Sequence, residues 1–160
     1  MRPAEFHLNI GSNSGDRRAI IGRAVAAIVS EFAPEGARVR TSSPVETEPW
    51  GFESENRFVN VGVALLFPSL DADALTGAQV DAVFSRLNAI ERTLSSMPHR
   101  NPDGSYRDRE LDIDLIGVVA RGYRDIGRIA MTTPGGIVLP HPRMHLRPFV
   151  TIPLTELLEQ

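Results

Sequence analysis

A long strand and a helix follow one another in residues 58–94, FVNVGVALLFPSLDADALTGAQVDAVFSRLNAIERTL. The first ten residues are nearly all apolar and rich in Val, which is typical of a buried strand. Pro68 and Ser69 are expected to end that strand. A helix is predicted over residues 71–94 because apolar side chains recur there at three- and four-residue spacing, at Val83, Leu87, Ile90 and Leu94.

A second strand and helix precede this pair. Residues 6–10, Phe-His-Leu-Asn-Ile, alternate apolar and polar side chains, as a half-buried strand does. Residues 17–32 carry apolar side chains at helical spacing, and Pro34 and Gly36 are expected to end that helix. A short strand is predicted at residues 38–43, before a Pro-rich loop.

The remaining elements complete the expected order. Residues 111–119 are predicted to form a strand, residues 120–140 a small hairpin, and residues 149–158 a helix interrupted by Pro153. The order β-α-β-β-α-β predicts an α+β fold, a ferredoxin-like sandwich with a C-terminal extension, in which an antiparallel sheet carries helices on one face. We expect residues 1–160 to form a single domain.

Composition limits the possible functions. The chain has 160 residues, of which 42% are hydrophobic and 23% charged, as in globular proteins. Its net charge of −3 argues against a general nucleic-acid binder, and the absence of Cys excludes disulfides and thiolate chemistry. No apolar stretch reaches the roughly 18 residues that a membrane span needs. A cytoplasmic protein can have this composition. Our expectation for this chain is a cytoplasmic monomer whose partners are small molecules.

Two carboxylates stand two residues apart in the predicted strand 111–119. Leu111, Ile113 and Leu115 would face the core, so Asp112 and Asp114 would share the opposite face. Hard oxygen ligands at this spacing suit Mg²⁺. The alternative is a solvated strand face on which each Asp pairs with a nearby Arg.

Basic side chains surround this strand in the sequence. They are Arg100, Arg107 and Arg109 before it, and His141, Arg143, His145 and Arg147 after it. Guanidinium groups match phosphate oxygens bidentately, so a phosphate-transfer site is one interpretation and surface ion pairing is the other. No Gly-x4-Gly-Lys-Ser/Thr loop is present, which excludes P-loop chemistry at the level of the motif.

An aromatic ring and an amide share one face of the strand that begins the quoted stretch. Phe58 and Asn60 lie two residues apart, and together they could stack on a flat heterocycle and bind its polar edge. The alternative is that Phe58 is a core residue, which is the commoner role of a single Phe in a strand. Asn60 in the middle of a strand is less usual, because a buried amide needs hydrogen-bond partners.

Five motifs in this order resemble the 6-hydroxymethyl-7,8-dihydropterin pyrophosphokinases of folate biosynthesis. The resemblance covers nearly the whole chain. The motifs are Gly11-Ser12-Asn13, Glu46-Thr47-Glu48-Pro49-Trp50-Gly51 with Phe58-Val59-Asn60-Val61-Gly62-Val63, Ile90-Glu91, Arg109-x-Leu-Asp112-x-Asp114, and Pro140-His141-Pro142-Arg143-Met144-His145-x-Arg147-x-Phe149-Val150.

The resemblance implies transfer of the β,γ-pyrophosphate of ATP to the pterin hydroxymethyl oxygen, with release of AMP. Asp112 and Asp114 would contact two Mg²⁺ ions on the triphosphate. The pterin would lie between Phe58 and Phe149, bound by Asn60 and Thr47 and by main-chain groups near Glu48 and Trp50. The implied ATP-binding residues are Glu91, Arg109, His141 and Arg147.

The chain departs from the family in residues 95–109, which resemble the loop that closes over ATP. Ser95 and Ser96 stand where the family usually carries Gly and Arg, and we expect Arg100 to supply the missing charge. Tyr106 and Asp108 replace a Trp and a Pro. Two alternatives therefore stay open: a non-catalytic pterin- or nucleotide-binding relative, and another Mg²⁺-dependent nucleotidyl or phosphoryl transferase.

Overall fold

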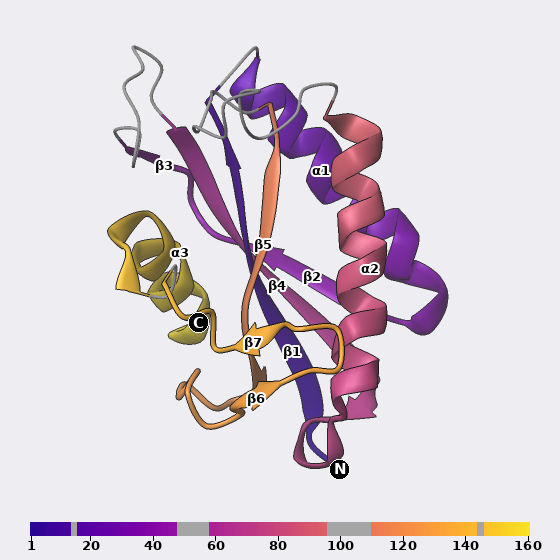
Figure 1. Ribbon diagram of the computed structural model, residues 1–160. Helices are drawn as coiled ribbons and strands as arrows, with labels where there is room; N and C mark the ends of the chain where they lie inside the picture. Colours follow the sequence, from indigo (N-terminus) through magenta and orange to yellow (C-terminus); the bar gives the residue numbers. More distant parts are fainter. Residues whose placement is uncertain (14–15, 48–57, 96–109, 144–145) are drawn as a thin grey trace.

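An antiparallel sheet organises the chain (Figure 1). The computed structural model describes residues 1–13, 16–47, 58–95, 110–143 and 146–160. Strand β1 (Pro3–Ser12) is central and pairs antiparallel with β4 (Phe58–Asp71) and β5 (Asp112–Ala120). The sheet order is β2-β4-β1-β5, where β2 spans Arg38–Thr41, and β3 (Val45–Thr47) pairs with the other half of β4. The predicted α+β class is confirmed.

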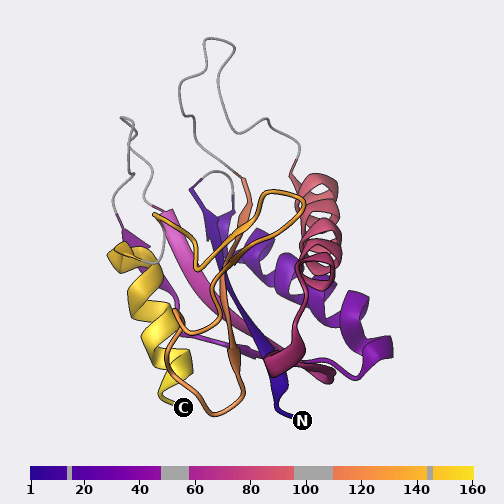
Figure 2. The same cartoon turned by 60° about the horizontal axis from the view of Figure 1, so that its bottom comes forward.

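Helices cover both faces of the sheet. Helices α1 (Arg17–Phe32) and α2 (Gly77–Leu94) pack together on one face, and α3 (Pro148–Leu158) packs on the other (Figures 1 and 2). The two faces are called the α1/α2 face and the α3 face below. A 3-10 turn, Ala33–Glu35, follows α1, and Gly36 ends it at a positive φ of 73°. None of the helices in the described ranges is long and apolar enough to cross a membrane.

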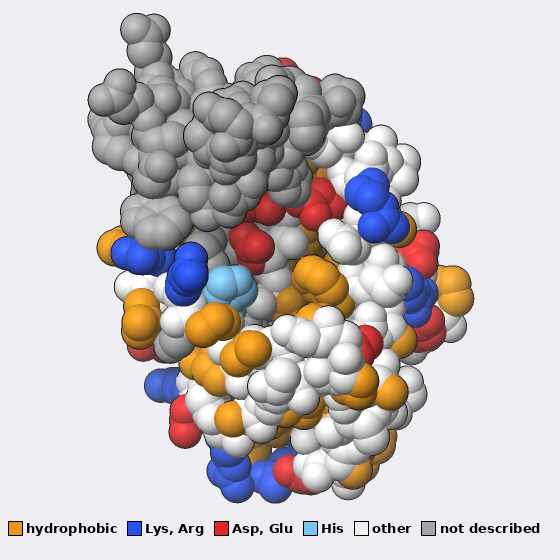
Figure 3. Space-filling view, in the orientation of Figure 1, with side chains coloured by type: hydrophobic (Ala, Val, Ile, Leu, Met, Phe, Trp, Pro, Cys, Tyr) orange, Lys and Arg blue, Asp and Glu red, His pale blue; other side chains and the backbone are white. Residues whose placement is uncertain are grey.

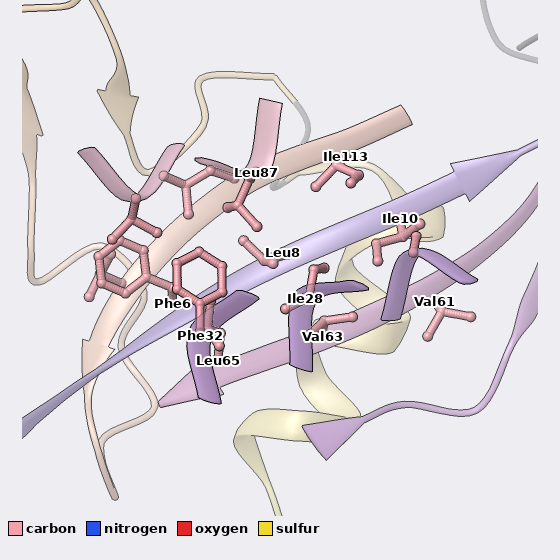
Figure 4. Close-up of a cluster of buried hydrophobic side chains, with 14 of the residues drawn as sticks. Phe6, Leu8, Ile10, Ile28, Phe32, Val61, Val63, Leu65, Leu87 and Ile113 are labelled. Atoms are coloured by element: carbon pink, nitrogen blue, oxygen red, sulfur yellow. The ribbon is translucent and has the colours of Figure 1, made fainter. Parts of the chain in front are cut away.

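The main hydrophobic core fills the α1/α2 face (Figure 4). Alternate residues of β1 point into it, and Phe6, Leu8 and Ile10 are buried there. Three phenylalanines form edge-to-face pairs in this core, with ring centroids 5.3 Å apart in Phe6–Phe67 and in Phe32–Phe67. A smaller cluster of Ile116, Val150 and Leu154 lies on the α3 face.

Capping residues fix the helix starts. The Asp16 side chain accepts a hydrogen bond from the Ala19 N–H, and α1 has the predicted bounds, 17–32. A capping box between Thr76 and Gln79 starts α2 at Gly77. The prediction that this helix begins near residue 71 was therefore wrong, and residues 72–74 form a separate 3-10 turn.

Strand β4 is longer than predicted. It continues past Pro68 and Ser69 to Asp71, because the pairing with β1 shifts register between Pro3 and Ala4 and accommodates the extra residues. Strand β2 ends at Thr41, two residues before its predicted end. The predicted hairpin within residues 120–140 is confirmed as β6 (Met131–Thr132) and β7 (Val138–Leu139).

Helix α3 runs through Pro153 without a break, so the predicted interruption was wrong. A proline lacks an N–H and leaves the carbonyl four residues before it without its helical donor. In α3 that carbonyl belongs to Phe149, and the Asn9 side-chain amide of β1 donates to it at 3.0 Å. A side chain of the sheet thus replaces the missing helical hydrogen bond.

Candidate active site

Polar residues of three strands meet on the α3 face near the end of β1. Gly11 lies opposite Asn60 of β4 on one side and opposite Asp112 of β5 on the other. The next row on the same face runs from Gly62 through Asn9 to Asp114. Directly opposed residues on a sheet have Cβ atoms about 5 Å apart, so each row brings its members within reach of one small ligand.

Gly11 leaves the middle of the first row open. A Cβ placed there would lie 2.8 Å from Asn60 Oδ1 and 3.8 Å from the Phe58 ring. Only glycine fits this close approach without displacing the amide. The sequence identified Gly11 as part of a motif and as the end of a strand, but it gave no sign of this contact with Asn60.

The two aspartates occupy the positions that alternation predicted. Ile113 and Leu115 are buried in the main core, whereas Asp112 and Asp114 are half-buried on the opposite face. Between them, the Ile113 N–H donates to the carboxylate of Glu91, which is 6% exposed, at 3.4 Å. Strand β5 is the edge strand of the sheet order, so its outer side has no neighbouring strand among the described residues. The Glu91 carboxylate of α2 accepts the hydrogen bond of the Ile113 N–H in place of a strand. The resemblance grouped Glu91 with the ATP-binding residues; the geometry gives it contact with the backbone between the aspartates.

The donor set fits a magnesium ion that is shared with a ligand. Among the described residues no cluster of three or more His, Asp or Glu side chains could hold a metal. Mg²⁺ is commonly bound by one or two carboxylates together with water and substrate phosphates, which matches the pair Asp112 and Asp114. Figure 3 shows acidic side chains gathered on this side of the molecule near a histidine.

The segment after β7 brings His141 to the same edge. Its backbone N–H donates to the Ile116 carbonyl at 2.7 Å, and its Nδ1 accepts from the Arg143 N–H at 3.3 Å. His141 and Asp114 line one hollow of about 290 Å³. The structure therefore brings together a predicted metal ligand and a predicted ATP-binding residue.

Helix α3 contributes the remaining described residues. Arg147 is its half-buried N-cap residue, whose carbonyl accepts from the Val150 and Thr151 N–H groups. Phe149 is half-buried beside the smaller apolar cluster, and the hydrogen bond from Asn9 holds its carbonyl against β1. Asn9 was missed in the sequence because the alternation in residues 6–10 predicted a half-buried strand with its polar side chains in solvent. That prediction was wrong, since Asn9 is 3% exposed and the α3 face of β1 is buried as well.

The remaining predicted residues lie on or beyond β3. The Thr47 backbone pairs with Phe58 across β3 and β4, beside the strand that carries the predicted pterin residues. Glu48, Trp50, Arg100 and Arg109 lie outside the described residues. Their roles stay predictions.

The fold is that of an α+β protein, and its candidate site carries carboxylates at one end of an antiparallel sheet. The model of a protein family, 7,8-dihydro-6-hydroxymethylpterin-pyrophosphokinase, matches residues 7–159. The chain belongs to this family. The match includes every described residue of the two rows around Asn9 and Gly11.

Curated relatives are similar over most of their length. A 2-amino-4-hydroxy-6-hydroxymethyldihydropteridine pyrophosphokinase of Porphyromonas gingivalis is 34% identical over 153 residues, which cover 96% of this chain and 90% of the relative. Proteins with the same name from Mycobacterium leprae and Bacillus subtilis are 32% and 28% identical, over 91% and 96% of this chain and 68% and 78% of their own lengths.

Proposed function

We propose that this chain transfers the pyrophosphoryl group of ATP to the hydroxymethyl group of 6-hydroxymethyl-7,8-dihydropterin and releases AMP, a step of folate biosynthesis. The observation that carries this proposal is the row Asn60–Gly11–Asp112, in a chain of this family. The row sets a side-chain amide and a carboxylate on either side of an open glycine. An amide can bind the donors and acceptors of a pterin edge, and a carboxylate can take part in phosphate chemistry.

The pterin side of the site is assigned to β4 and α3. In this proposal the ring lies between Phe58 and Phe149, and Asn60 binds its polar edge. Thr47 and main-chain groups near Glu48 and Trp50 complete the pocket. The hydrogen bond from Asn9 to the Phe149 carbonyl supports this arrangement, because it fixes the start of α3 relative to the sheet.

The ATP side is assigned to β5 and the segments around it. Asp112 and Asp114 would hold two Mg²⁺ ions, which when bound neutralise charge on the transferring phosphates. Arg109, His141 and Arg147 would bind ATP, and Arg100 would add charge from the segment before β5. Glu91 supports the aspartates through the Ile113 N–H. Positioning and charge neutralisation are the main requirements of phosphoryl transfer, so no strong base is assigned.

The topology, domain organisation and oligomeric state of the chain are part of the same proposal. The strand order and antiparallel pairing support a ferredoxin-like arrangement in which α3 is the C-terminal extension. We propose a single domain over residues 1–160 that acts as a cytoplasmic monomer on small molecules.

An AMP-release assay tests the reaction. The protein would receive ATP, Mg²⁺ and 6-hydroxymethyl-7,8-dihydropterin, with a control that lacks the pterin. We expect AMP only when the pterin is present. Release of ADP or pyrophosphate instead would support a different Mg²⁺-dependent transferase, and pterin binding without AMP would support a non-catalytic relative.

Calorimetry on Asn60→Ala tests the assignment of the pterin pocket. Loss of a hydrogen-bonding amide from a buried site costs about 1–3 kcal/mol, so pterin binding should weaken by roughly 5- to 150-fold. ATP binding should be unchanged, because Asn60 lies across β1 from the two aspartates. Weaker ATP binding with unchanged pterin binding would reverse the assignment.

A further inference from the structure

A second hollow lies on the α3 face at the opposite end of the sheet. Its volume is about 560 Å³, and it is bordered by the start of β1, the end of β5 and the C-terminal end of α3. The side chains that define it here are Glu5, Arg38, Arg40, Arg121, Tyr123 and Arg124. We call it the arginine pocket. The candidate active site lies at the other end of β1, near Asn9 and Gly11.

Four arginines converge on this pocket from two distant segments. Arg38 and Arg40 are in β2, and Arg121 and Arg124 follow β5. Within the described part of the chain, Arg38, Arg121 and Arg124 make no ion pair or side-chain hydrogen bond, and all three are exposed. Like charges gathered around one hollow repel each other, so this cluster does not stabilise the fold by itself.

Glu5 is the single acidic residue in the lining, and its carboxylate already has partners. Arg40 Nη2 donates to both of its oxygens at 3.1 Å, and His7 Nε2 lies 2.8 Å from Oε1. Burial raises the pKa of the Glu5 carboxyl, but His7 and Arg40 lower it by more, and the resulting pKa lies below the ordinary value. The ionised carboxylate therefore orients Arg40, and among the described residues the other three arginines form no ion pair with it.

The walls of the pocket are also held in place. Arg40 Nη1 donates to the Leu157 carbonyl at 3.3 Å and to Gln160 Oε1 at 2.9 Å, which ties β2 to the end of α3. Arg2 and Arg128 lie 4.8 and 5.3 Å from the centre of the Tyr123 ring. Pre-organised walls reduce the entropy lost when a ligand binds.

We propose that the arginine pocket binds a small organic anion that carries two or more phosphate or carboxylate groups. Guanidinium groups bind both kinds of oxyanion bidentately. The volume falls in the range of about 300–1,000 Å³ that is usual for small-molecule sites. A concave pocket of this size, in a chain with a net charge of −3, favours a compact anion over a nucleic acid or an acidic protein segment.

Calorimetry with inorganic tripolyphosphate and with citrate, both without Mg²⁺, tests this proposal. These probes represent the phosphate and carboxylate sources of the same chemistry. The pocket variant is Arg121→Ala/Arg124→Ala, and Arg38→Ala is a second, independent variant. The matched control is Arg23→Ala/Arg92→Ala, which removes two exposed arginines from α1 and α2 on the other face.

Loss of one charged hydrogen bond should weaken binding by roughly 10-fold or more, so the double pocket variant should weaken binding of at least one probe by roughly 100-fold or more. Arg38→Ala should weaken it as well, and the matched control should bind as the wild type does. Equal affinity in the pocket and control variants would overturn the proposal, as would no binding of either probe to the wild type. If only His141→Ala lost binding, the probe would bind at the candidate active site, and the proposal would be overturned. Tighter binding of a deca-glutamate peptide than of both probes would assign the pocket to a protein partner instead.

Discussion

The two faces of strand β1 are both buried but differ completely in chemistry. Phe6, Leu8 and Ile10 face α1 and α2, and all are apolar. Glu5, His7 and Asn9 face α3; they are 5%, 1% and 3% exposed, and all are polar. Burial of apolar side chains stabilises the fold, whereas a buried polar group is destabilising unless it is hydrogen-bonded. One face of the strand therefore holds the protein together, and the other positions functional groups.

Hydrogen bonds on the α3 face reduce the loss of stability that its buried polar groups cause. Arg40 and His7 bind Glu5, and the Phe149 carbonyl accepts from Asn9. Arg40 connects β2 to Glu5 of β1, and Asn9 connects β1 to α3, so these two contacts also help to place the residues of the two pockets. Mutations on the two faces should for this reason affect different properties.

The largest effect is expected from Phe6→Ala on the α1/α2 face. Removal of a fully buried ring that contacts Phe67 should lower the free energy of unfolding by about 3–5 kcal/mol. Urea denaturation of the full chain measures this. A loss below about 1 kcal/mol would mean that the core relaxes around the cavity and that the contrast between the faces is weaker than proposed.

Asp112→Ala should reduce activity and leave stability nearly unchanged, the reverse of the effect expected for Phe6→Ala. Loss of one pre-organised charged group should reduce pterin-dependent AMP release by about 10²- to 10³-fold. The free energy of unfolding should change little, because Asp112 is half-buried beside a second carboxylate. Glu159→Ala, which removes an exposed carboxylate at the end of α3, is the control. Unfolding of Asp112→Ala, seen by circular dichroism, would contradict a purely functional role.

A pair of glycine substitutions tests how closely α3 must approach the sheet. A Cβ at Gly62 would lie 2.9 Å from Pro153 Cβ and 3.0 Å from Leu157 Cδ1, so Gly62→Ala should cost about 1–3 kcal/mol of stability. Gly22 of α1 has open space around it, and Gly22→Ala should stabilise the chain by up to about 1 kcal/mol. Equal effects of the two substitutions would show that α3 adjusts without penalty.

The smallest effect is the coupling between Asn9 and Pro153. Asn9→Ala alone removes the donor to the part-buried Phe149 carbonyl, at a cost of about 1–3 kcal/mol. In a Pro153→Ala background the helix regains an N–H at position 153, which can donate to the same carbonyl, so Asn9→Ala should cost about 1 kcal/mol less. A double-mutant cycle of unfolding free energies measures the difference. Additive effects would show that Asn9 does not substitute for the helical bond.

Local patterns predicted most elements, and contacts between distant segments account for the differences. The bounds of α1 were predicted because its apolar spacing and its cap are both local. The predicted break at Pro153 was wrong because Asn9, which is distant in the sequence, donates to the Phe149 carbonyl that Pro153 leaves without a helical donor. At the site, alternation was enough to place Asp112 and Asp114 on one face. The alignment of Asp112 with Asn60 across Gly11 depends on the register of three strands, which no single stretch of sequence contains.

The contact between Glu91 and the Ile113 N–H also bears on how the chain behaves at high concentration. An edge strand with vacant backbone groups is a template onto which another chain can add and start aggregation. On the outer side of β5, the Glu91 carboxylate accepts from Ile113, and the His141 N–H donates to the Ile116 carbonyl. A second chain that added to this edge would first have to displace both groups, so the residues that support the candidate site also protect the sheet from self-association.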